Sequence, residues 1–365
     1  MLLLKKILYI AATVLTWALY LLALTSGYGG FIDPEVTVIP GILTLVFLPL
    51  FVLTLIPAAL WLIFRRRRPI ALAGIAVVVL LLYPFFTVSP LSFPSGPKPG
   101  EKVLKVLTYN VHHFARSAKD STRTEIVDYL LRSDADVICL QEACVFTYFR
   151  YPPETTHPMF SHELGRKYPY MRWGTDNEMA ILSRYPLSWE GPLAKIHDQC
   201  AVAAEVQVEP GKSVTVFCVH FPSYRLSDDE KGVVTQLDRG FDGMKKSARE
   251  MKRSILGKLK RAALARASFA AGIDSVASLI PGRQIVCGDF NDVPLSYTWR
   301  LFNSSGFRDA YVDAGNGPMY TFNAFHMLFH IDQILYRGDM RAVSVEKGRL
   351  KASDHYPVSA TFVIR

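Results

Sequence analysis

The chain has 365 residues, and 50% of them are hydrophobic, so its composition excludes a protein that lies entirely in water. The net charge of +9 suggests an acidic partner, but seven basic and only two acidic side chains precede Gly100. More than half of the positive excess therefore flanks the hydrophobic segments, and membrane topology explains it better than an acidic ligand does. The five cysteines have no metal-ligand spacing, which excludes an ordinary zinc site.

Three apolar runs predict a membrane anchor of three transmembrane helices within residues 1–90. Ile7–Leu24 is uncharged and close to the ~20 residues that a helix needs to cross a bilayer. Val36–Phe64 is longer and contains three prolines, so its helix is expected to be kinked or shorter than the run. Ile70–Phe86 is again close to spanning length, and no cleavage site of the A-x-A kind follows the first run.

The basic residues predict the orientation of these helices. Lys5 and Lys6 precede the first run and Arg65–Arg68 separate the second from the third, whereas the first connecting loop has no basic residue. Because lysine and arginine near span ends stay cytoplasmic, the N-terminus and the arginine loop are expected inside. Everything after the third span is then extracytoplasmic, and the chain is expected in a bacterial cytoplasmic membrane.

A segment rich in proline, serine and glycine, residues 91–102, predicts a linker to a second domain at residues 103–365. Short apolar runs rich in β-branched residues recur after Val103, and several alternate with polar residues as half-buried strands do. Helical patterns lie between them, notably Thr122–Leu131 and a long one from about Asp242 to Leu279. The mixture predicts a two-sheet α/β sandwich with outer helices.

Polar side chains collect at the ends of six apolar runs, where strands deliver residues to a shared edge. Most follow a run, whereas Asp332 lies within HIDQIL and Asp354 with His355 precede the final predicted strand. A single case would be an ordinary strand cap, but six are harder to dismiss. The residues are Asn110, Glu142, His220, Asp289 with Asn291, Asp332, and Asp354 with His355. The set contains carboxylates, amides and imidazoles without thiolates, which suits Mg²⁺, with Mn²⁺ as the alternative. Phosphoester hydrolysis needs these parts: a cation for the phosphate, a base for water, and donors for the developing charge.

The motifs TYN, CLQE, VHF, GDFND and SDHYPV occur in this order and resemble those of the endonuclease/exonuclease/phosphatase superfamily. The resemblance covers Val103–Arg365, and GDFND together with SDHYPV is its specific part. It implies a four-layered α/β sandwich, two packed mixed β-sheets flanked by helices, preceded here by the bundle of three transmembrane helices. It also implies a metal-dependent phosphoesterase.

Residue by residue, the resemblance implies a metal site and a water-activating group. Glu142 would be the main Mg²⁺ ligand, helped by Asn110, and Asp354 would lie near the metal. Asp289 would position or deprotonate the attacking water, and Asn291 would hold a phosphate oxygen beside it.

The resemblance implies three further catalytic roles. His355 would contact the scissile phosphate and be oriented by Asp332. His220 would donate to the phosphate or protonate the leaving oxygen. In pancreatic-type deoxyribonucleases a glutamate partners this histidine, and here either Asn177 or Glu178 fills its place.

Other residues leave the substrate open. His112 stands where abasic-site repair enzymes of the superfamily have a carboxylate, and these enzymes have a tyrosine at the position of His220. Both differences argue against abasic-site repair. The basic helix 245–266 is interpreted as a solvated face, a contact for anionic lipid, or a contact for nucleic-acid backbone. His326 and His330 are interpreted as substrate-loop or core residues.

The function expected is hydrolysis of phosphodiesters or phosphomonoesters outside the cytoplasm. The substrate class, phospholipid, nucleic acid or inositol phosphate, is unresolved. The alternatives are a membrane-tethered nuclease and a catalytically silent interaction module, and the completeness of the site residues argues against the silent module.

Cys139, Cys218 and Cys287 lie in apolar runs and are expected to be buried thiols, while a Cys144–Cys200 bridge stays open.

Overall fold

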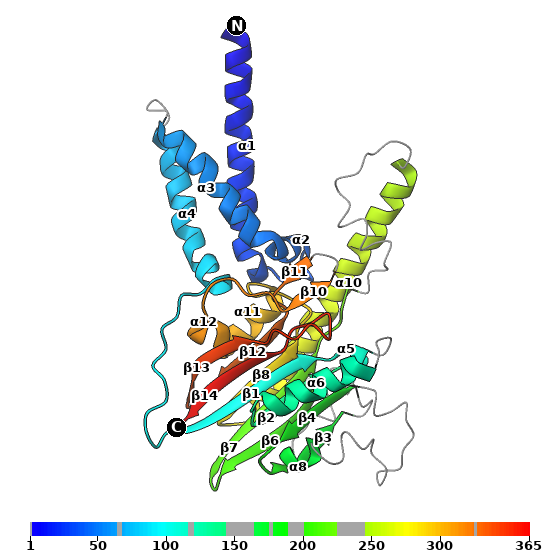
Figure 1. Cartoon of the computed structure of the whole chain (residues 1–365). Helices are drawn as coiled ribbons and strands as arrows, with labels where there is room; N and C mark the ends of the chain where they lie inside the picture. The colour runs from blue at the N-terminus through cyan, green and yellow to red at the C-terminus, as the bar shows by residue number, and fades with distance from the viewer. Residues whose placement is uncertain are drawn as a thin grey trace.

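A computed structural model describes residues 2–63, 68–115, 120–143, 164–174, 178–188, 201–224, 245–324 and 327–365. It consists of a helical bundle on one end of an α/β sandwich (Figure 1). The statements below concern these residues. Cys144, Cys200, Asn177 and His326 lie outside them.

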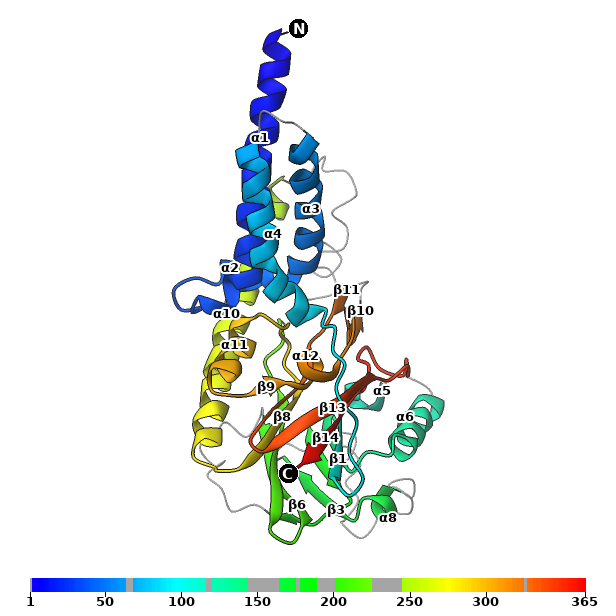
Figure 2. The same cartoon turned by 90° about the vertical axis from the view of Figure 1, so that its left-hand side faces the viewer.

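Three N-terminal helices are long and apolar enough to cross a membrane: Leu3–Phe31, Ile39–Ile63 and Pro69–Val88. Their elements are α1 (Leu2–Tyr28), η1 (Gly29–Phe31), α2 (Ile39–Leu43), η2 (Thr44–Val46), α3 (Phe47–Ile63) and α4 (Arg68–Val88). They run side by side in both views (Figure 2). The prolines break the second run as expected: Pro40 lies in short α2, and the regular helix begins only at Phe47.

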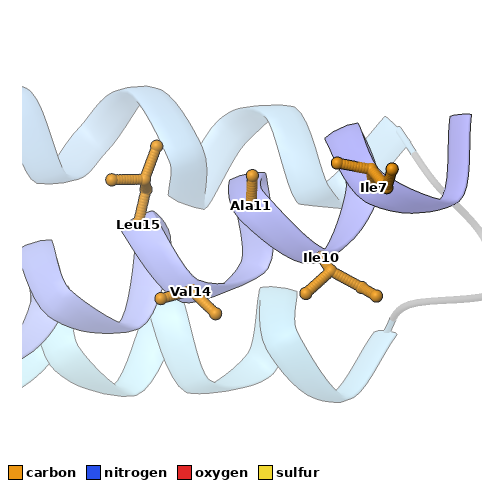
Figure 3. Close-up of a pocket in the computed structure, with 5 residues that line it drawn as sticks. All are labelled: Ile7, Ile10, Ala11, Val14 and Leu15. Atoms are coloured by element: carbon orange, nitrogen blue, oxygen red, sulfur yellow. The ribbon is translucent and has the colours of Figure 1, made fainter. Parts of the chain in front are cut away.

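The outer surface of α1 is apolar. Ile7, Ile10, Val14 and Leu15 are exposed and, with Ala11, line a hollow on this helix (Figure 3). An exposed apolar face of this length is unstable in water but stable against lipid chains. Membrane association of the bundle follows from this surface.

Two six-stranded mixed sheets form the sandwich. The first has the order β13-β14-β1-β2-β4-β3, and the second has the order β5-β6-β7-β8-β12-β9. In the first sheet the strands are β1 (Lys102–Asn110), β2 (Val137–Gln141), β3 (Tyr170–Trp173), β4 (Met179–Ser183), β13 (Met340–Lys347) and β14 (Val358–Ile364). In the second they are β5 (Leu187–Ser188), β6 (Ala201–Glu209), β7 (Lys212–His220), β8 (Arg283–Asp289), β9 (Arg308–Asp309) and β12 (Asp332–Arg337).

Helices cover the outer face of each sheet. A buried apolar cluster fills the space between the sheets, a second packs α6 (Asp120–Arg132) on the first sheet, and a third packs α10 (Lys245–Ser278) and α11 (Tyr297–Ser304) on the second. The order helix, sheet, sheet, helix confirms the four-layered sandwich. The remaining elements are α5 (His112–Ala115), α8 (Gly165–Lys167), α12 (Ala310–Ala314) and the hairpin β10 (Phe322–Ala324) to β11 (Met327–Phe329).

Sequence patterns missed β3, β9, β13 and the hairpin β10–β11. Strand β13 contains charged residues and a register shift at Ala342/Ser344, so its apolar alternation is weak. The three predicted thiols, Cys139, Cys218 and Cys287, are free and buried.

The segment after α4 lies along the sandwich. Ser92 donates from its hydroxyl to the Val312 carbonyl at 2.7 Å, and Arg341 donates to the Ser95 carbonyl at 2.6 Å and pairs with Glu101 at 3.0 Å. The connection between bundle and sandwich is therefore held by hydrogen bonds, although its composition is that of a flexible linker.

Candidate active site

The C-terminal ends of the central strands meet at one edge of the sandwich. β1 and β2 are parallel with Asn110 opposite Gln141, and β7 and β8 are parallel with His220 opposite Asp289. β12 runs antiparallel to β8 and begins at Asp332, which lies opposite Asp289. Because the two parallel pairs belong to different sheets, both layers contribute side chains to this edge.

The turn after β8 fixes the Asp289 carboxylate. Gly288 has φ +150°, and a Cβ there would lie 1.9 Å from the Val219 carbonyl oxygen, so only glycine permits this approach of β8 to β7. Asp289 Oδ1 accepts from the Asn291 backbone N–H at 2.8 Å. Asn291 is left-handed, and its Nδ2 donates to the Phe221 carbonyl at 2.9 Å.

A buried histidine and carboxylate lie beside this turn. His355 Nδ1 and Asp332 Oδ2 are 2.8 Å apart, and His355 Nε2 is 3.6 Å from Asp289 Oδ2. Burial opposes the charged imidazole, but the Asp332 and Asp289 carboxylates outweigh it and raise the pKa of His355 to about 10. The hydrogen bond predicted between Asp332 and His355 is thus present, and the Nε2 edge faces the carboxylate at the strand end.

Asn110 connects the two halves of the site. Its Nδ2 donates to Glu142 Oε1 at 3.0 Å and to Asp289 Oδ2 at 3.1 Å. His220 Nε2 lies 3.7 Å from both of these oxygens. The contacts that the structure shows for His220 are therefore with Glu142 and Asp289.

Two histidines that follow β1 also lie in the site. His112 Nδ1 is 3.2 Å from Asp354 Oδ1, and His113 Nε2 is 3.4 Å from Glu142 Oε2. The hydrogen bond to Asp354 raises the pKa of His112. His112, His113 and Glu142 have φ of 43°, 53° and 52°, a conformation that costs free energy in residues other than glycine. Such strain is typical of functional sites.

The carboxylates differ in what they can offer a cation. Asp289, Asp332 and His355 are close enough to hold an ion, but the facing atoms of Asp332 and His355 already bind each other. The Glu142 and Asp354 side chains are 23% and 32% exposed and present oxygens at the edge. This set of hard oxygen donors fits a divalent cation such as Mg²⁺.

The comparison with protein families decides the identity of the fold. A sequence model described as the endonuclease/exonuclease/phosphatase family matches residues 107–355. The chain belongs to this family. Members of the family are metal-dependent phosphoesterases, and this chain is accordingly a hydrolase of phosphoester bonds.

Several solved structures resemble the chain at low sequence identity. A humanized TDP2 from D. rerio is 15% identical, covers 71% of this chain and 98% of its own, and has a TM-score of 0.49. An endonuclease/exonuclease/phosphatase from Beutenbergia cavernae is 16% identical with 72% of each chain covered and a TM-score of 0.45. Beta toxin from Staphylococcus aureus is 16% identical, covers 70% of this chain and 99% of its own, and has a TM-score of 0.40. No curated protein matches the sequence.

The family motifs bring all of the predicted site residues to one edge. They are Asn110, Glu142, His220, Asp289, Asn291, Asp332, Asp354 and His355. Sequence reasoning missed His113 and gave His112 no role in the site, although two histidines directly after a strand-end Asn-Val are a usable signal. His330 is a core residue: it is buried and packs edge-on against Tyr311, and burial lowers its pKa to about 4.

The interpretation of the basic helix 245–266 as an exposed or ligand-binding face is wrong for one residue. Arg266 is 2% exposed, so it belongs to no lipid-facing or solvated surface. Its Nε lies 3.3 Å from Asp292 Oδ2, and its Nη1 donates to the Pro222 carbonyl at 3.2 Å. The side chain ties α10 to the last residue of the GDFND turn because an ion pair is the stable arrangement for a buried guanidinium.

Proposed function

We propose that this protein is a Mg²⁺-dependent phosphodiesterase that works on the extracytoplasmic side of a membrane. The observation that carries the proposal is the arrangement of His355, Asp332 and Asp289. One buried carboxylate orients the imidazole, and a second carboxylate faces its other nitrogen. Such a unit can hold a phosphoryl group and take a proton from water at the same point.

The proposal gives each of these residues a role. Asp289 accepts the proton of the attacking water while the water oxygen forms its bond to phosphorus. The bond from phosphorus to one alcohol oxygen breaks, and His220 gives that oxygen a proton. His355 Nε2 donates to a non-bridging phosphoryl oxygen, and Asn291 holds a second one after its amide turns from Phe221.

Glu142 and Asp354 would hold the divalent cation, which supplies positive charge to the phosphate. Asn110 positions Glu142 by donating to Oε1, and the His113 imidazole lies against Oε2. Mg²⁺ takes few protein carboxylates and keeps part of its water shell, which agrees with two carboxylates at an open edge. Mn²⁺ has similar ligand preferences and is expected to substitute.

An assay of the full chain in detergent tests the metal requirement. Purified protein is given bis(p-nitrophenyl) phosphate, DNA, RNA, phospholipid and inositol phosphates, with Mg²⁺ or with EDTA. We expect hydrolysis of at least one class that EDTA abolishes. Glu142→Gln should raise the Mg²⁺ concentration needed for half-maximal rate by at least about tenfold, because one charged ligand becomes neutral. Full activity of this variant in EDTA would exclude the metal mechanism.

The side of the membrane has its own test. Lys5 and Lys6 precede the first span, and the arginine loop lies between the second and third, which supports an outside position for Gly100 onward. A reporter enzyme that is active only outside the cytoplasm, fused after Arg365, should be active. An inactive reporter, together with an active cytoplasmic reporter at the same position, would reverse the proposed orientation.

A further inference from the structure

The sandwich rests directly on the ends of the transmembrane helices. The first span ends at Phe31 and the third at Val88, and a side chain of each span contacts Arg300 of α11. The Arg300 guanidinium lies 4.2 Å from the Phe31 ring centroid and donates from Nη1 to the Tyr83 hydroxyl at 3.0 Å. Because Tyr83 is inside the third span, the sandwich contacts the bundle more than one helical turn below its end.

The segment that follows the catalytic turn is part of this contact. Leu295 is fully buried and belongs to the same apolar cluster as Tyr20, Phe47 and Leu81 of the bundle. Gly30 lies against the backbone of this segment so closely that a Cβ there would be 1.9 Å from the Leu295 carbonyl oxygen. The absence of a side chain at Gly30 therefore permits the contact.

Contacts of Tyr297 and Arg300 also hold α11, which follows this segment, against the bundle. Tyr297 donates from its hydroxyl to Asp33 Oδ2 at 3.3 Å, which links α11 to the loop between the first two spans. The buried Arg300 guanidinium also lies over the rings of Tyr83 and Trp299, at 5.3 and 5.1 Å. An arginine enclosed by aromatic rings and hydrogen-bonded to one of them holds α11 at a defined position.

These contacts limit how far the site lies from the membrane. Asp289 precedes Leu295 by six residues, and an extended chain covers at most ~3.6 Å per residue, so the two lie within about 22 Å. Leu295 packs where the spans end. The catalytic carboxylate is therefore held close to the head-group layer, which begins where the hydrocarbon core ends.

The hairpin β10–β11 adjoins the site on the same side. The Phe322 ring of the hairpin β10–β11 packs edge-on against the His355 ring, with 5.0 Å between the centroids. The backbones of the two residues form an isolated antiparallel β-bridge. In both views this hairpin lies at the end of the sandwich that carries the bundle (Figures 1 and 2). Phe31 at the end of η1 and Val36 in the loop that follows are 63% and 80% exposed and suit the apolar side of a membrane surface.

We infer that the substrate is a lipid of the same membrane whose head group carries a phosphodiester. The inference rests on the proposed phosphoesterase function and adds the substrate class. The bundle holds the catalytic turn at the membrane surface through Gly30, Leu295 and Arg300, and this fixed height brings a lipid phosphate to Asp289 and His355. A substrate carried by a facing membrane or a distant particle has no such access.

Reconstitution of the full chain in vesicles tests this access. Vesicles of phosphatidylethanolamine and phosphatidylglycerol carry head-group-labelled lipid either in the same bilayer as the protein or only in added protein-free vesicles. Water-soluble label released in Mg²⁺ is measured, with bis(p-nitrophenyl) phosphate as the soluble substrate. We expect release from the same bilayer, at most about a tenth of that rate from the added vesicles, and hydrolysis of the soluble substrate in both samples.

A glycine pair provides the matched variants. Gly30→Ala inserts a methyl group between bundle and catalytic segment, whereas Gly41→Ala meets nothing within 4 Å on the nearby α2. Gly30→Ala should lower lipid hydrolysis in the same bilayer by about tenfold or more, since a small displacement of the site relative to the lipid phosphate is enough to slow the reaction. The rate with the soluble substrate should stay within about threefold of the wild type. Gly41→Ala should match the wild type for both substrates.

The outcomes separate the two claims. Metal-dependent hydrolysis of the soluble substrate without release of lipid head group in the same bilayer overturns the lipid inference and leaves the phosphoesterase intact. Equal rates from both vesicle populations, or an equal loss of both activities in Gly30→Ala, also overturn it. Failure with every substrate in Mg²⁺ counts against the proposed function itself, because the soluble substrate needs no membrane.

Discussion

The Asp332 carboxylate is fully buried and binds His355 Nδ1. A carboxylate in this position leaves Nε2 as the edge of the ring that faces the substrate, and it favours the charged imidazole. Asp289 Oδ2, 3.6 Å from Nε2, adds to this preference. The three side chains are thus expected to act as a unit, and their effects on turnover should not be additive.

A double-mutant cycle measures that coupling. His355→Ala should reduce kcat by at least ~10²-fold, the scale of a lost acid–base or oxyanion contact. Asp332→Asn should reduce kcat by a smaller factor in the wild-type background and hardly at all in the His355→Ala background, because Asp332 acts by orienting the imidazole. Independent, multiplying effects of the two substitutions in steady-state kinetics would show that Asp332 acts on the metal or on folding instead.

Individual site residues could be predicted where they lie beside the ends of apolar strands and match a motif. Asp289 and His355 are examples, since GDFND and SDHYPV are specific. The contact of His113 with Glu142 and the burial of Arg266 could not be predicted, for different reasons. The left-handed backbone that turns His113 toward Glu142 depends on tertiary contacts. Arg266 ends a run of basic residues in the sequence, and the pattern of that run suggests a solvated face although Arg266 itself is buried.

Helix α10 is joined to the catalytic turn by the buried pair of Arg266 and Asp292. Asp292 Oδ2 also accepts from the Thr298 hydroxyl at 3.2 Å, and Gln333 Nε2 donates to the Asp292 carbonyl at 2.7 Å. Residues from α10, α11 and β12 therefore converge on the end of the GDFND turn. The pair positions the turn and does not contact the reacting atoms.

Removal of one charge from this pair should destabilise the fold strongly. Asp292→Asn leaves the Arg266 guanidinium buried without a counter-charge and should cost about 3–5 kcal/mol of unfolding free energy. Thr298→Val is the milder control and should cost about 1 kcal/mol, since it removes a single hydrogen bond. Denaturant unfolding in detergent checks both values, and equal small losses would show that the guanidinium finds another partner.

Elements with strong periodicity were predictable, and those defined by their neighbours were not. The apolar spans and the central strands β1, β7 and β8 follow from sequence because each carries a long apolar run. Strand β9 has two residues and pairs only through β12, so its strand conformation is a consequence of packing. The length of a run decides whether local sequence is informative.

The relation between bundle and sandwich is the least predictable feature of the chain. Composition indicates a flexible linker at residues 91–102, and a linker implies two independent parts. The structure instead shows Arg300 bonded to Tyr83 and Leu295 buried with bundle residues. Contacts between residues more than two hundred positions apart leave no local pattern. The sequence could therefore predict that the anchor lies in a membrane, but not that it contacts the segment beside the site.

The hydrolysis rate of Asp289→Asn tests the central claim most directly. This variant keeps the shape of the side chain and its hydrogen bond to the Asn291 N–H, and it removes the charge that accepts the water proton together with the hydrogen bond from Asn110. With full-length protein in detergent, Mg²⁺ and bis(p-nitrophenyl) phosphate, we predict a loss in kcat of at least ~10²-fold with little loss of stability. A rate within about twofold of the wild type would contradict the assignment of this edge of the sandwich as the catalytic centre.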